Sequence, residues 1–353
     1  MLLLKIVQDN FYKIKMIKKI KALVLFSGGL DSILAVKLLE KQGIEVAGIC
    51  FSSNFFGAEK AREIATANRI KLFVEDFSLD ILNLVKNPPH GLGKNMNPCV
   101  DCHARMFRRA REFANKKGYD FLASGEVLGQ RPFSQNKQAL VEVAKTAGEE
   151  LLRPLSAKLL PETEMEKRGL VDREQLLDLQ GRQRNPQSEL AEKFGIKEFE
   201  APAGGCLLTD PAFGKRLEKA LEEFPEMDCL DVELLKNGRV YWAKLKDCQN
   251  SILVVIGRDK DENQRLEELF IEKDFLLKPK NVMGPNVLVR SFGCDLNFDQ
   301  KEIEIKVPKE KPAELIDQNF SDEIELFEGI GILAGWYIKK ARGEKVKFLV
   351  KYS

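Results

Sequence analysis

The sequence predicts an α/β fold in which a doubly wound parallel sheet is joined to a second, smaller α+β domain. From Ala22 to about Gly125, short apolar runs alternate with segments of helical periodicity, as in parallel sheets. Strand-like runs dominate after Phe224-Pro225-Glu226, so the composition changes there. A length of 353 residues also fits about two domains. The expected division is an N-terminal extension at 1–19, a first domain at 20–215, a second at 225–300 and an α+β segment at 301–353.

The first half contains four strand-like runs with amphipathic segments between them. In doubly wound sheets, ligands bind at the carboxyl ends of the strands, so the loops after the strands are the candidates for a functional site. The predicted strands are Leu23–Phe26, Val46–Phe51, Lys71–Glu75 and Phe121–Ser124, and the predicted helices are Asp31–Lys41, Ala58–Asn68 and Ala104–Lys117.

The second half is predicted to be mostly strands. Its tail alternates apolar and charged residues from Glu302 to Val307, which indicates a half-buried strand. The Gly-rich run Gly329–Gly335 does not fit G-x-G-x-x-G, so we expect an apolar helix there and no dinucleotide site. The other predicted strands are Arg239–Lys244, Ser251–Ile256, Phe275–Lys278 and Asn286–Arg290, with a charged helix at Asp259–Phe270.

The composition is that of a soluble globular protein, with 44% apolar and 31% charged residues. A net charge of +2 is too small to indicate nucleic-acid binding by itself. No apolar run is long enough for a membrane span, and lysines follow the short apolar start without a cleavage site, so we expect no membrane partner and a cytoplasmic location. Met16 could be the natural start, and residues 1–15 are expected to lie outside the fold.

The run Ser27-Gly28-Gly29-Leu30-Asp31-Ser32 stands between an apolar strand and a predicted helix. Two glycines let backbone N–H groups approach oxyanions, and the helix N-terminus adds positive potential, so this loop predicts a phosphate site. It lacks the lysine of a Walker A loop. The alternative is a capped helix start in which the glycines only make the turn.

Seven cysteines, an odd number in a long chain, do not indicate a disulfide framework. Cys50 lies in a strand pattern and is expected in the core. Cys99 and Cys102 stand three residues apart at a predicted helix start, so both thiols would share one helix face and the helix dipole would favour their thiolates. Cys206 lies in the Gly-rich run 201–210, where packing does not require a cysteine.

Several kinds of chemistry fit Cys99, Cys102 and Cys206. Three thiolates with an open position suit an iron–sulfur cluster of the 4Fe-4S type with one exposed iron, which is the first expectation. Zinc bound by Cys99, Cys102, His103 or Cys206 is an alternative, as is a persulfide-carrying cysteine resolved through a disulfide. A further alternative is that the three cysteines have a purely structural role.

Two further segments in the first half are candidates for ligand contacts. Gly125 and Glu126 follow the fourth predicted strand, where a nucleoside would be enclosed, and Glu126 could bind a metal or a ribose. Six basic residues crowd the helix after Cys102 and are expected either to meet phosphates or to form a solvated face. They are Arg105, Arg108, Arg109, Arg111, Lys116 and Lys117.

The S-G-G-L-D-S run resembles the signature loop of the PP-loop ATP pyrophosphatases. That resemblance implies cleavage of ATP between its α and β phosphates and transfer of AMP to a substrate oxygen. It also implies that the loop holds pyrophosphate and that its acidic residue helps to place Mg²⁺. The loop residues that carry this expectation are Ser27, Gly28, Gly29, Asp31 and Ser32.

Three further motifs narrow the resemblance, which covers about residues 20–215. The run G-E-V-L-G-Q from Gly125, followed by L-R-P-L from Leu152, resembles the tRNA 4-thiouridine synthases. The run from Asn97 to Cys102 is similar to a loop of the tRNA 2-thiouridylases, and a C-x-x-C with a distant third cysteine resembles iron–sulfur-dependent tRNA thiolation enzymes. If Cys99 replaces an acid of the 2-thiouridylase pattern, Asp101 is the nearest substitute for its proton-transfer role.

The segment 225–300 loosely resembles the small RNA-associated module at the C-terminus of NFACT proteins. The likeness rests on short motifs, such as G-R-x-Y-W from Gly238 and G-P-N-V from Gly284. It would imply RNA contacts by stacking and by phosphate binding. The alternative is a packing domain without RNA contact. The residues expected to make such contacts are Trp242, Lys244, Arg258, Lys278 and Arg290.

Together these motifs predict an ATP-dependent tRNA sulfurtransferase. It would adenylate a uridine carbonyl and replace the oxygen with sulfur, with 4-thiouridine favoured over 2-thiouridine. The expected partners are ATP, Mg²⁺, tRNA and a sulfur donor, either inorganic sulfide or a cysteine desulfurase-type carrier; a homodimer is possible. The rivals are a cluster-free persulfide thiolase, a PP-loop amidotransferase or base synthase acting on a small molecule, and a non-catalytic RNA-binding protein.

Overall fold

The computed structural model describes residues 19–131, 135–148, 150–199, 205–246, 248, 250–293, 295–312 and 319–352. The chain divides into two compact units, one made of the described residues up to 93 and in 97–206, the other of 94–96 and 207–353. Most of the expected N-terminal extension lies outside the described residues. Among those described, no helix has the length and apolarity that a membrane span needs.

The N-terminal unit is built on a four-stranded parallel sheet with the strand order β3-β2-β1-β4. Both β2 and β4 pair with β1, so Leu23 lies opposite Ala47 on one side and Leu122 on the other. All four predicted strands are confirmed. Their bounds are β1 Lys21–Leu25, β2 Glu45–Ser52, β3 Leu72–Asp76 and β4 Phe121–Ser124.

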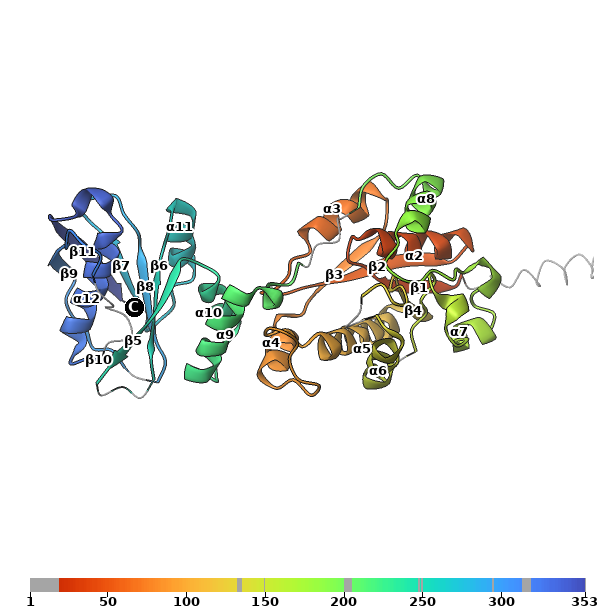
Figure 1. Ribbon diagram of the computed structural model, residues 1–353, viewed down its shortest axis with the longest axis horizontal. Coiled ribbons are helices and arrows are strands. Elements are labelled where there is room, and N and C mark those ends of the chain that lie inside the picture. The colour runs from red at the N-terminus through yellow and green to blue at the C-terminus, as the bar shows by residue number, and fades with distance from the viewer. Residues whose placement is uncertain are drawn as a thin grey trace, which may run out of the picture. The chain divides into compact units, whose positions relative to one another are not determined.

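Helices cover both faces of this sheet, as a doubly wound fold requires. Helices α2, α3 and α8 lie on one face, and α4, α5 and α6 on the other (Figure 1). The three predicted helices are confirmed. Helix α5 begins at Cys99, where the cysteine pair was expected at a helix start, and α4 and α6 were not predicted. The bounds are α2 Leu30–Lys41, α3 Glu59–Ala67, α4 Ser78–Lys86, α5 Cys99–Lys117, α6 Lys137–Ala147, α7 Glu164–Lys167 and α8 Asn185–Phe194.

The chain changes direction across the sheet between β1 and β4. It runs from β1 outward to β2 and β3, then returns through α4 and α5 to place β4 on the free side of β1. Side chains of β1 and α2, such as Val24 and Ile33, are fully buried in the core on the α2 face. The carboxyl ends of β1 and β4 therefore meet at a topological switch point, where doubly wound folds bind ligands.

The C-terminal unit contains a seven-stranded sheet with the order β10-β5-β6-β8-β7-β11-β9. Strand β10 pairs with β5 in parallel, and the other neighbours are antiparallel. The predicted strands are confirmed; α9, α10, β10 and β11 were not predicted. The segments 225–300 and 301–353 contribute to the same sheet. The bounds are α9 Pro211–Glu223, α10 Cys229–Leu235, β5 Arg239–Leu245, β6 Ile252–Ile256, α11 Lys260–Glu268, β7 Phe275–Pro279, β8 Val287–Ser291, β9 Glu302–Lys306, β10 Asn319–Phe320, α12 Glu323–Trp336 and β11 Lys345–Tyr352.

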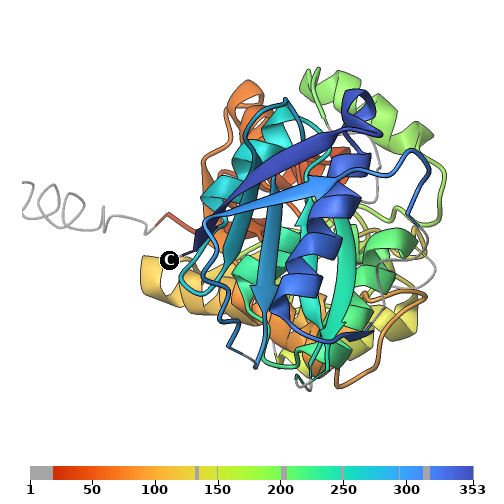
Figure 2. The same ribbon diagram turned by 90° about the vertical axis from the view of Figure 1, so that its left-hand side faces the viewer.

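The glycine-rich run 329–335 lies in α12, which crosses one face of this sheet (Figure 2). A Cβ atom on Gly335 would lie 2.6 Å from Val307 Cγ2, and one on Gly331 would lie 3.1 Å from Ile303 Cδ1. The glycines therefore let α12 approach β9 closely. This confirms the predicted apolar helix and explains its glycines by packing.

Two residues expected to contact RNA lie in the interior of the C-terminal unit, so that prediction is wrong for them. Trp242 is buried, with its ring 5.6 Å from that of Phe224. Arg290 is 3% exposed and binds Asp274 through two hydrogen bonds of 2.9 and 2.7 Å, with a third of 2.8 Å to Asp231. Its guanidinium joins β8, α10 and the start of β7 and is not available to a phosphate.

Of the other three residues expected to contact RNA, Arg258 and Lys278 are engaged within the unit. Arg258 pairs with Glu262, and Lys278 Nζ lies 2.7 Å from Glu267. Lys244 is exposed. Among the residues expected to contact RNA, Lys244 is thus the exposed cation that makes no ion pair with any described residue.

Removing the Arg290 guanidinium should destabilise the C-terminal unit strongly, because two buried carboxylates would lose their counter-charge. We expect Arg290→Met to lower the free energy of unfolding by about 3–5 kcal/mol. The two tryptophans of the chain, Trp242 and Trp336, both lie in this unit, so denaturation followed by tryptophan fluorescence reports on it. The control Arg258→Met removes an exposed ion pair and should cost less than about 1 kcal/mol. Equal losses for the two variants would contradict the prediction.

Candidate nucleotide and sulfur site

The loop Ser27-Gly28-Gly29 connects β1 to α2 in a conformation that depends on glycine. Gly28 has φ of 81°, and a Cβ there would lie 3.2 Å from the Cα of Ala61 on α3. Ser27 Oγ accepts a hydrogen bond from the Gly29 N–H at 3.3 Å, and Ser32 Oγ donates to the Gly29 carbonyl at 2.7 Å. Gly29 is the N-cap of α2, and no side chain caps this end. The helix N-terminus is therefore suited to an anion.

The end of β4 lies directly against the first turn of α2. A Cβ added to Gly125 would be 2.5 Å from the backbone carbon and oxygen of Asp31 and from the Ser32 nitrogen. Only glycine fits at that distance. Gln130 Nε2 also donates to Asp31 Oδ2 at 2.9 Å. The two loops predicted from the sequence thus form one continuous surface.

A cavity of about 550 Å³ lies at this end of the sheet and is lined by both loops. Of the predicted nucleotide-binding residues, Ser27, Gly29, Asp31, Ser32, Gly125 and Glu126 line it. Its apolar wall contains Leu25, Phe26, Ile49, Phe51, Phe56, Met106 and Phe107, and its cationic lining contains Lys60, Arg131 and Arg184. An apolar wall beside cations and a helix N-terminus suits a nucleotide, which carries a planar base and anionic phosphates.

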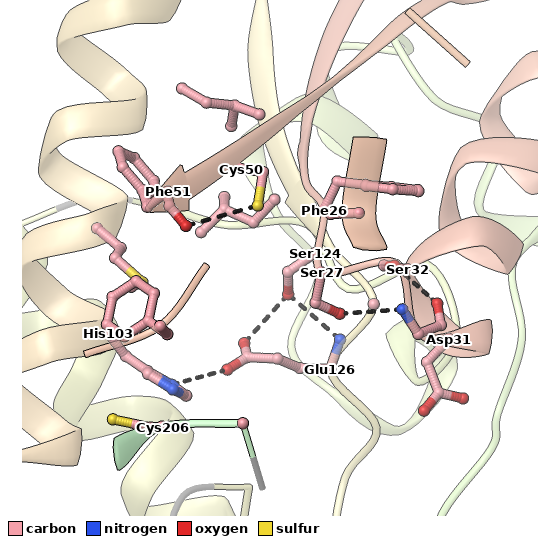
Figure 3. Close-up of a pocket in the computed structure, with 18 of the residues that line it drawn as sticks. Phe26, Ser27, Asp31, Ser32, Cys50, Phe51, His103, Ser124, Glu126 and Cys206 are labelled. Carbon is pink, nitrogen blue, oxygen red and sulfur yellow. Dashed lines mark hydrogen bonds and ion pairs between the residues drawn. The ribbon is translucent and has the colours of Figure 1, made fainter. Parts of the chain in front are cut away.

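Glu126 is held in this cavity as a carboxylate. Its Oε2 accepts hydrogen bonds from Arg153 Nε at 2.9 Å and Ser124 Oγ at 3.1 Å, while His103 Nδ1 lies 3.7 Å from Oε1 (Figure 3). Burial alone would raise the pKa of Glu126, but the charge of Arg153 and the contacts with His103 outweigh it and lower the pKa to about 2. The side chain therefore stays charged at neutral pH and is unsuited to accept a proton.

Cys206 lines the same cavity as the phosphate loop. Cys99, the first residue of α5, is exposed and accepts a hydrogen bond from Asn97 Nδ2 at 3.2 Å, whereas Cys102 is buried one turn further along. Burial raises the pKa of Cys102, and the negative charges of Cys206, Cys99 and Asp101 raise it further. Cys102 thus interacts electrostatically with both other cysteines. Burial and these charges therefore oppose the thiolate form of Cys102, which the helix dipole is expected to favour.

The identity of these three donors fits a cluster or a zinc ion, since a bound cation would relieve the repulsion between thiolates. Their positions are not assembled for one. Within the part of the chain that the structure describes, no three His, Cys, Asp or Glu side chains are grouped closely enough to hold a metal ion. The three thiols are therefore chemically suited to bind a cluster or a zinc ion, but the described residues do not already form a metal-binding group.

Asp101 faces the loop that leads to α5. Its carboxylate accepts a hydrogen bond from the His90 N–H at 3.0 Å and contacts His90 Nδ1 at 2.6 Å. Asp101 is 3% exposed and is not among the residues that line the cavity. The structure therefore places it where it fixes the loop before Cys99.

Three of the six basic residues on α5 hold neighbouring helices. Arg105 Nε lies 2.6 Å and Arg109 Nη1 3.4 Å from the carboxylate of Asp80 on α4. Arg108 donates to the Thr146 carbonyl on α6. These contacts give the three arginines an intramolecular role.

Several cavity residues were not predicted from the sequence as part of a nucleotide site. Arg153, which binds Glu126 but is not among the residues that line the cavity, stands in the L-R-P-L run. The cavity residues Lys60, Arg131 and Arg184 resemble any other surface cation in the sequence. Arg184 precedes α8, far along the chain from β1. Only the tertiary fold brings these side chains to one cavity.

The fold and the site together define a doubly wound α/β domain of the PP-loop class, whose glycine-rich loop is suited to bind an anion. Residues 18–158 match the family described as “Thiamine biosynthesis protein (ThiI)”. This match covers the part of the N-terminal unit that carries the glycine-rich loop and Glu126.

Relatives with assigned names are thiolation enzymes of two kinds. A probable tRNA sulfurtransferase of Thermoanaerobacter sp. is 27% identical over 59% of this chain and 50% of its own. A tRNA-specific 2-thiouridylase MnmA of Bacteroides fragilis is 34% identical over 30% of this chain and 31% of its own. A crystal structure of a 4-thiouridine synthetase–RNA complex with bound ATP has a TM-score of 0.36 and 20% identity, covering 58% of this chain and 51% of that one. The chain thus spans about half or less of the length of these proteins.

Alanine at Gly125 should separate the two loops of the site. The added Cβ meets backbone atoms that cannot rotate away, so β4 or the start of α2 must shift at a cost of about 1–3 kcal/mol. We expect faster hydrogen–deuterium exchange in peptides that cover 21–41 and 121–131 of Gly125→Ala. Gly205→Ala is the control, because a Cβ there would meet no atom within 4 Å. Unchanged exchange in both variants would contradict the close packing.

The carboxylate of Glu126 should make the stability of the N-terminal unit pH-dependent. Its pKa is about 2 in the folded protein and ordinarily 4.5, so the charged group stabilises the fold above pH 4.5 and this contribution is lost as the pH falls toward 2. We expect Glu126→Gln to be less stable by on the order of 3 kcal/mol at pH 7, with a smaller difference at pH 3. Urea unfolding followed by far-UV circular dichroism measures this. The exposed Glu192→Gln should follow the wild type, and a pH-independent difference for Glu126→Gln would refute the assignment.

Proposed function

We propose that this protein is an ATP-dependent tRNA sulfurtransferase, which adenylates a uridine carbonyl and replaces its oxygen with sulfur. One observation carries the proposal: a single cavity is lined by the S-G-G-L-D-S loop and by Cys206. The loop suits activation by ATP, and the cysteine, coupled electrostatically to Cys102, suits the handling of sulfur. The ThiI-type match at 18–158 and the thiolation relatives support the same chemistry.

In this proposal the N-terminus of α2 and the cations of the cavity bind the phosphates of ATP. The uridine oxygen attacks the α-phosphorus, the bond from that phosphorus to the bridging oxygen breaks, and pyrophosphate leaves. Backbone N–H groups at Gly29 and beyond, with Lys60, Arg131 and Arg184, would stabilise the charge that develops on pyrophosphate. Asp31 is the residue we propose to help place Mg²⁺, although it also accepts a hydrogen bond from Gln130.

The second half of the reaction exchanges AMP for sulfur. A sulfur nucleophile attacks the activated carbon, the bond from that carbon to the AMP oxygen breaks, and AMP leaves. We propose that Cys99, Cys102 and Cys206 hold an iron–sulfur cluster, which would supply a position for inorganic sulfide beside the nucleotide cavity. Asp101 receives no proton-transfer role in this proposal, because its carboxylate is bound to His90.

The proposal also specifies which carbon of the uridine is thiolated and where in the cell the reaction takes place. We favour carbon 4 over carbon 2, because the G-E-V-L-G-Q run resembles the corresponding run of the 4-thiouridine synthases. Cytoplasmic tRNA is the proposed substrate. For the C-terminal unit, an RNA-binding role of the NFACT kind stays a prediction.

The decisive test is formation of a thionucleoside. Anaerobically reconstituted protein is incubated with ATP, sulfide and unmodified tRNA, and the digested tRNA is analysed by mass spectrometry, which also distinguishes 4-thiouridine from 2-thiouridine. We expect Cys206→Ser to lose product by at least about a hundredfold, as expected for a group that acts in the chemical step. Cys229→Ser, on α10 of the C-terminal unit, should retain activity.

The same preparation separates a cluster from its alternatives. Iron and sulfide in the active protein, with the visible absorption of a cluster, would support the three-cysteine cluster. Active protein without iron would overturn that part. Activity without iron that requires a persulfide donor in place of sulfide would favour a persulfide on Cys206. Conversion of ATP to AMP with a small acid, but without retention of tRNA at low salt, would overturn the tRNA substrate.

A further inference from the structure

The end of α12 in the C-terminal unit carries two adjacent aromatic rings, those of Trp336 and Tyr337. The ring centroids are 5.2 Å apart and the rings meet edge to face. Both side chains are half-buried, so each keeps part of its surface exposed. The hydroxyl of Tyr337 also forms a hydrogen bond with the hydroxyl of Tyr241 on β5. Two elements of the unit therefore hold this aromatic pair in a fixed position.

A guanidinium group lies against each of these rings. Arg239 Cζ is 4.1 Å from the ring centroid of Tyr337, and Arg342 Cζ is 4.4 Å from that of Trp336. Each arginine also donates to a backbone carbonyl, Arg239 Nη1 to Gly257 at 3.2 Å and Arg342 Nε to Trp336 at 3.1 Å. The ring contact and the hydrogen bond orient each guanidinium plane before any partner binds.

The charge on this surface comes from several separate segments. Lys311, which follows β9, places its Nζ 6.0 Å from the ring centroid of Trp336, and Lys339 and Lys340 are exposed just after α12. Cations are favoured at the carboxyl end of a helix, which accounts for the last two lysines. That preference does not account for Lys311, or for Arg239 on β5.

Within the described part of the unit, no carboxylate forms an ion pair with the two arginines or the three lysines of this surface. Other cations of the same unit do have such partners. Arg258 pairs with Glu262, and Arg265 Nη1 lies 3.0 Å from Glu268. The charge around the aromatic pair is therefore available to an anionic partner.

Cations that alternate with aromatic rings match RNA in both kinds of contact that it makes. Phosphates meet the charges, and unpaired bases stack on aromatic rings and on the planes of guanidinium groups. The carboxylates of an acidic protein would use only the charges. A lipid headgroup would leave the two flat guanidinium groups without a stacking partner.

We propose that Arg239, Trp336, Tyr337 and Arg342 form a binding surface for a single-stranded segment of tRNA, with the three lysines against the neighbouring phosphates. The inference deepens the proposed function and rests on it for the choice of tRNA among RNAs. It assigns RNA to residues of the C-terminal unit other than those expected from the sequence.

The test removes both guanidinium groups and measures binding of unmodified, fluorescently labelled tRNA to the full chain by anisotropy at several salt concentrations. We expect Arg239→Gln/Arg342→Gln to bind at least about tenfold more weakly at low salt, with a slope of log Kd against log salt that is smaller by about one to two. Lysine at both positions keeps the charge but not the planar group. It should restore the salt slope and only part of the affinity, and full recovery would overturn the stacking role.

Arg258→Gln/Arg265→Gln is the matched control, because it removes the same charge from cations of the same unit that already have partners. It should bind tRNA as the wild type does. A second variant, Lys339→Gln/Lys340→Gln, changes only exposed side chains and should also reduce the affinity and the salt slope. Far-UV circular dichroism shows whether each variant is folded.

The outcomes distinguish this inference from the proposed function. If the wild type binds tRNA and the arginine and lysine variants bind it equally well, the inference is overturned and the proposed function stands. If the arginine variant loses tRNA but the wild type forms no thionucleoside, the proposed function is overturned and the binding surface stands. If the wild type does not retain tRNA at low salt, both are overturned.

Vesicles of phosphatidylcholine and phosphatidylserine in equal parts are the probe for a lipid partner. If the arginine variant loses binding to these vesicles and keeps its affinity for tRNA, the surface belongs to a membrane contact and the inference is overturned. If it loses tRNA while the wild type ignores the vesicles, the RNA assignment is supported.

Discussion

The contact between Gly125 and the first turn of α2 is the constraint on which the N-terminal site depends. The Cα of Gly125 packs against the backbone of Asp31 and Ser32 so closely that no side chain fits between them. This contact joins the carboxyl ends of β1 and β4, the two strands that flank the switch point. It places Glu126 immediately beside the helix start that is suited to phosphate. Without it, the two loops would be separate features of one sheet edge.

Charge is distributed around this contact in a way that suits both parts of a nucleotide. The N-terminus of α2 and the cations Lys60, Arg131 and Arg184 line the cavity, and the carboxylate of Glu126 is kept charged by Arg153. A fixed negative charge in a site for an anion is costly unless a donor or a cation meets it. The cations of the cavity would therefore attract an anionic ligand, while the carboxylate of Glu126 would admit only a ligand that offers it a donor or a cation. Cys206 adds a thiol to the same cavity, and burial raises the pKa of Cys102, the second cysteine of α5.

The C-terminal unit shows how burial overrides a reading based on residue type. Trp242 and Arg290 are typical of RNA-binding surfaces in composition, but the first packs on Phe224 and the second neutralises Asp274 and Asp231 inside the unit. The glycines of α12 likewise serve its approach to β9. For Trp242 and Arg290, the pairing of β5 and β8 within the seven-stranded sheet decides that their side chains face inward.

The sequence by itself determined the parallel sheet, the phosphate loop and the cysteines worth considering. These features are local: apolar runs of strand length, two glycines before a helix, and a C-x-x-C at a helix start. It could not show α4, the convergence of Lys60, Arg131 and Arg184, or the engagement of Asp101 by His90, because each depends on contacts between distant segments. The tertiary structure also buries Cys102, which raises its pKa against the effect of the helix dipole. Local backbone conformation is encoded in a few neighbouring residues, whereas burial and electrostatic environment arise only when the elements pack.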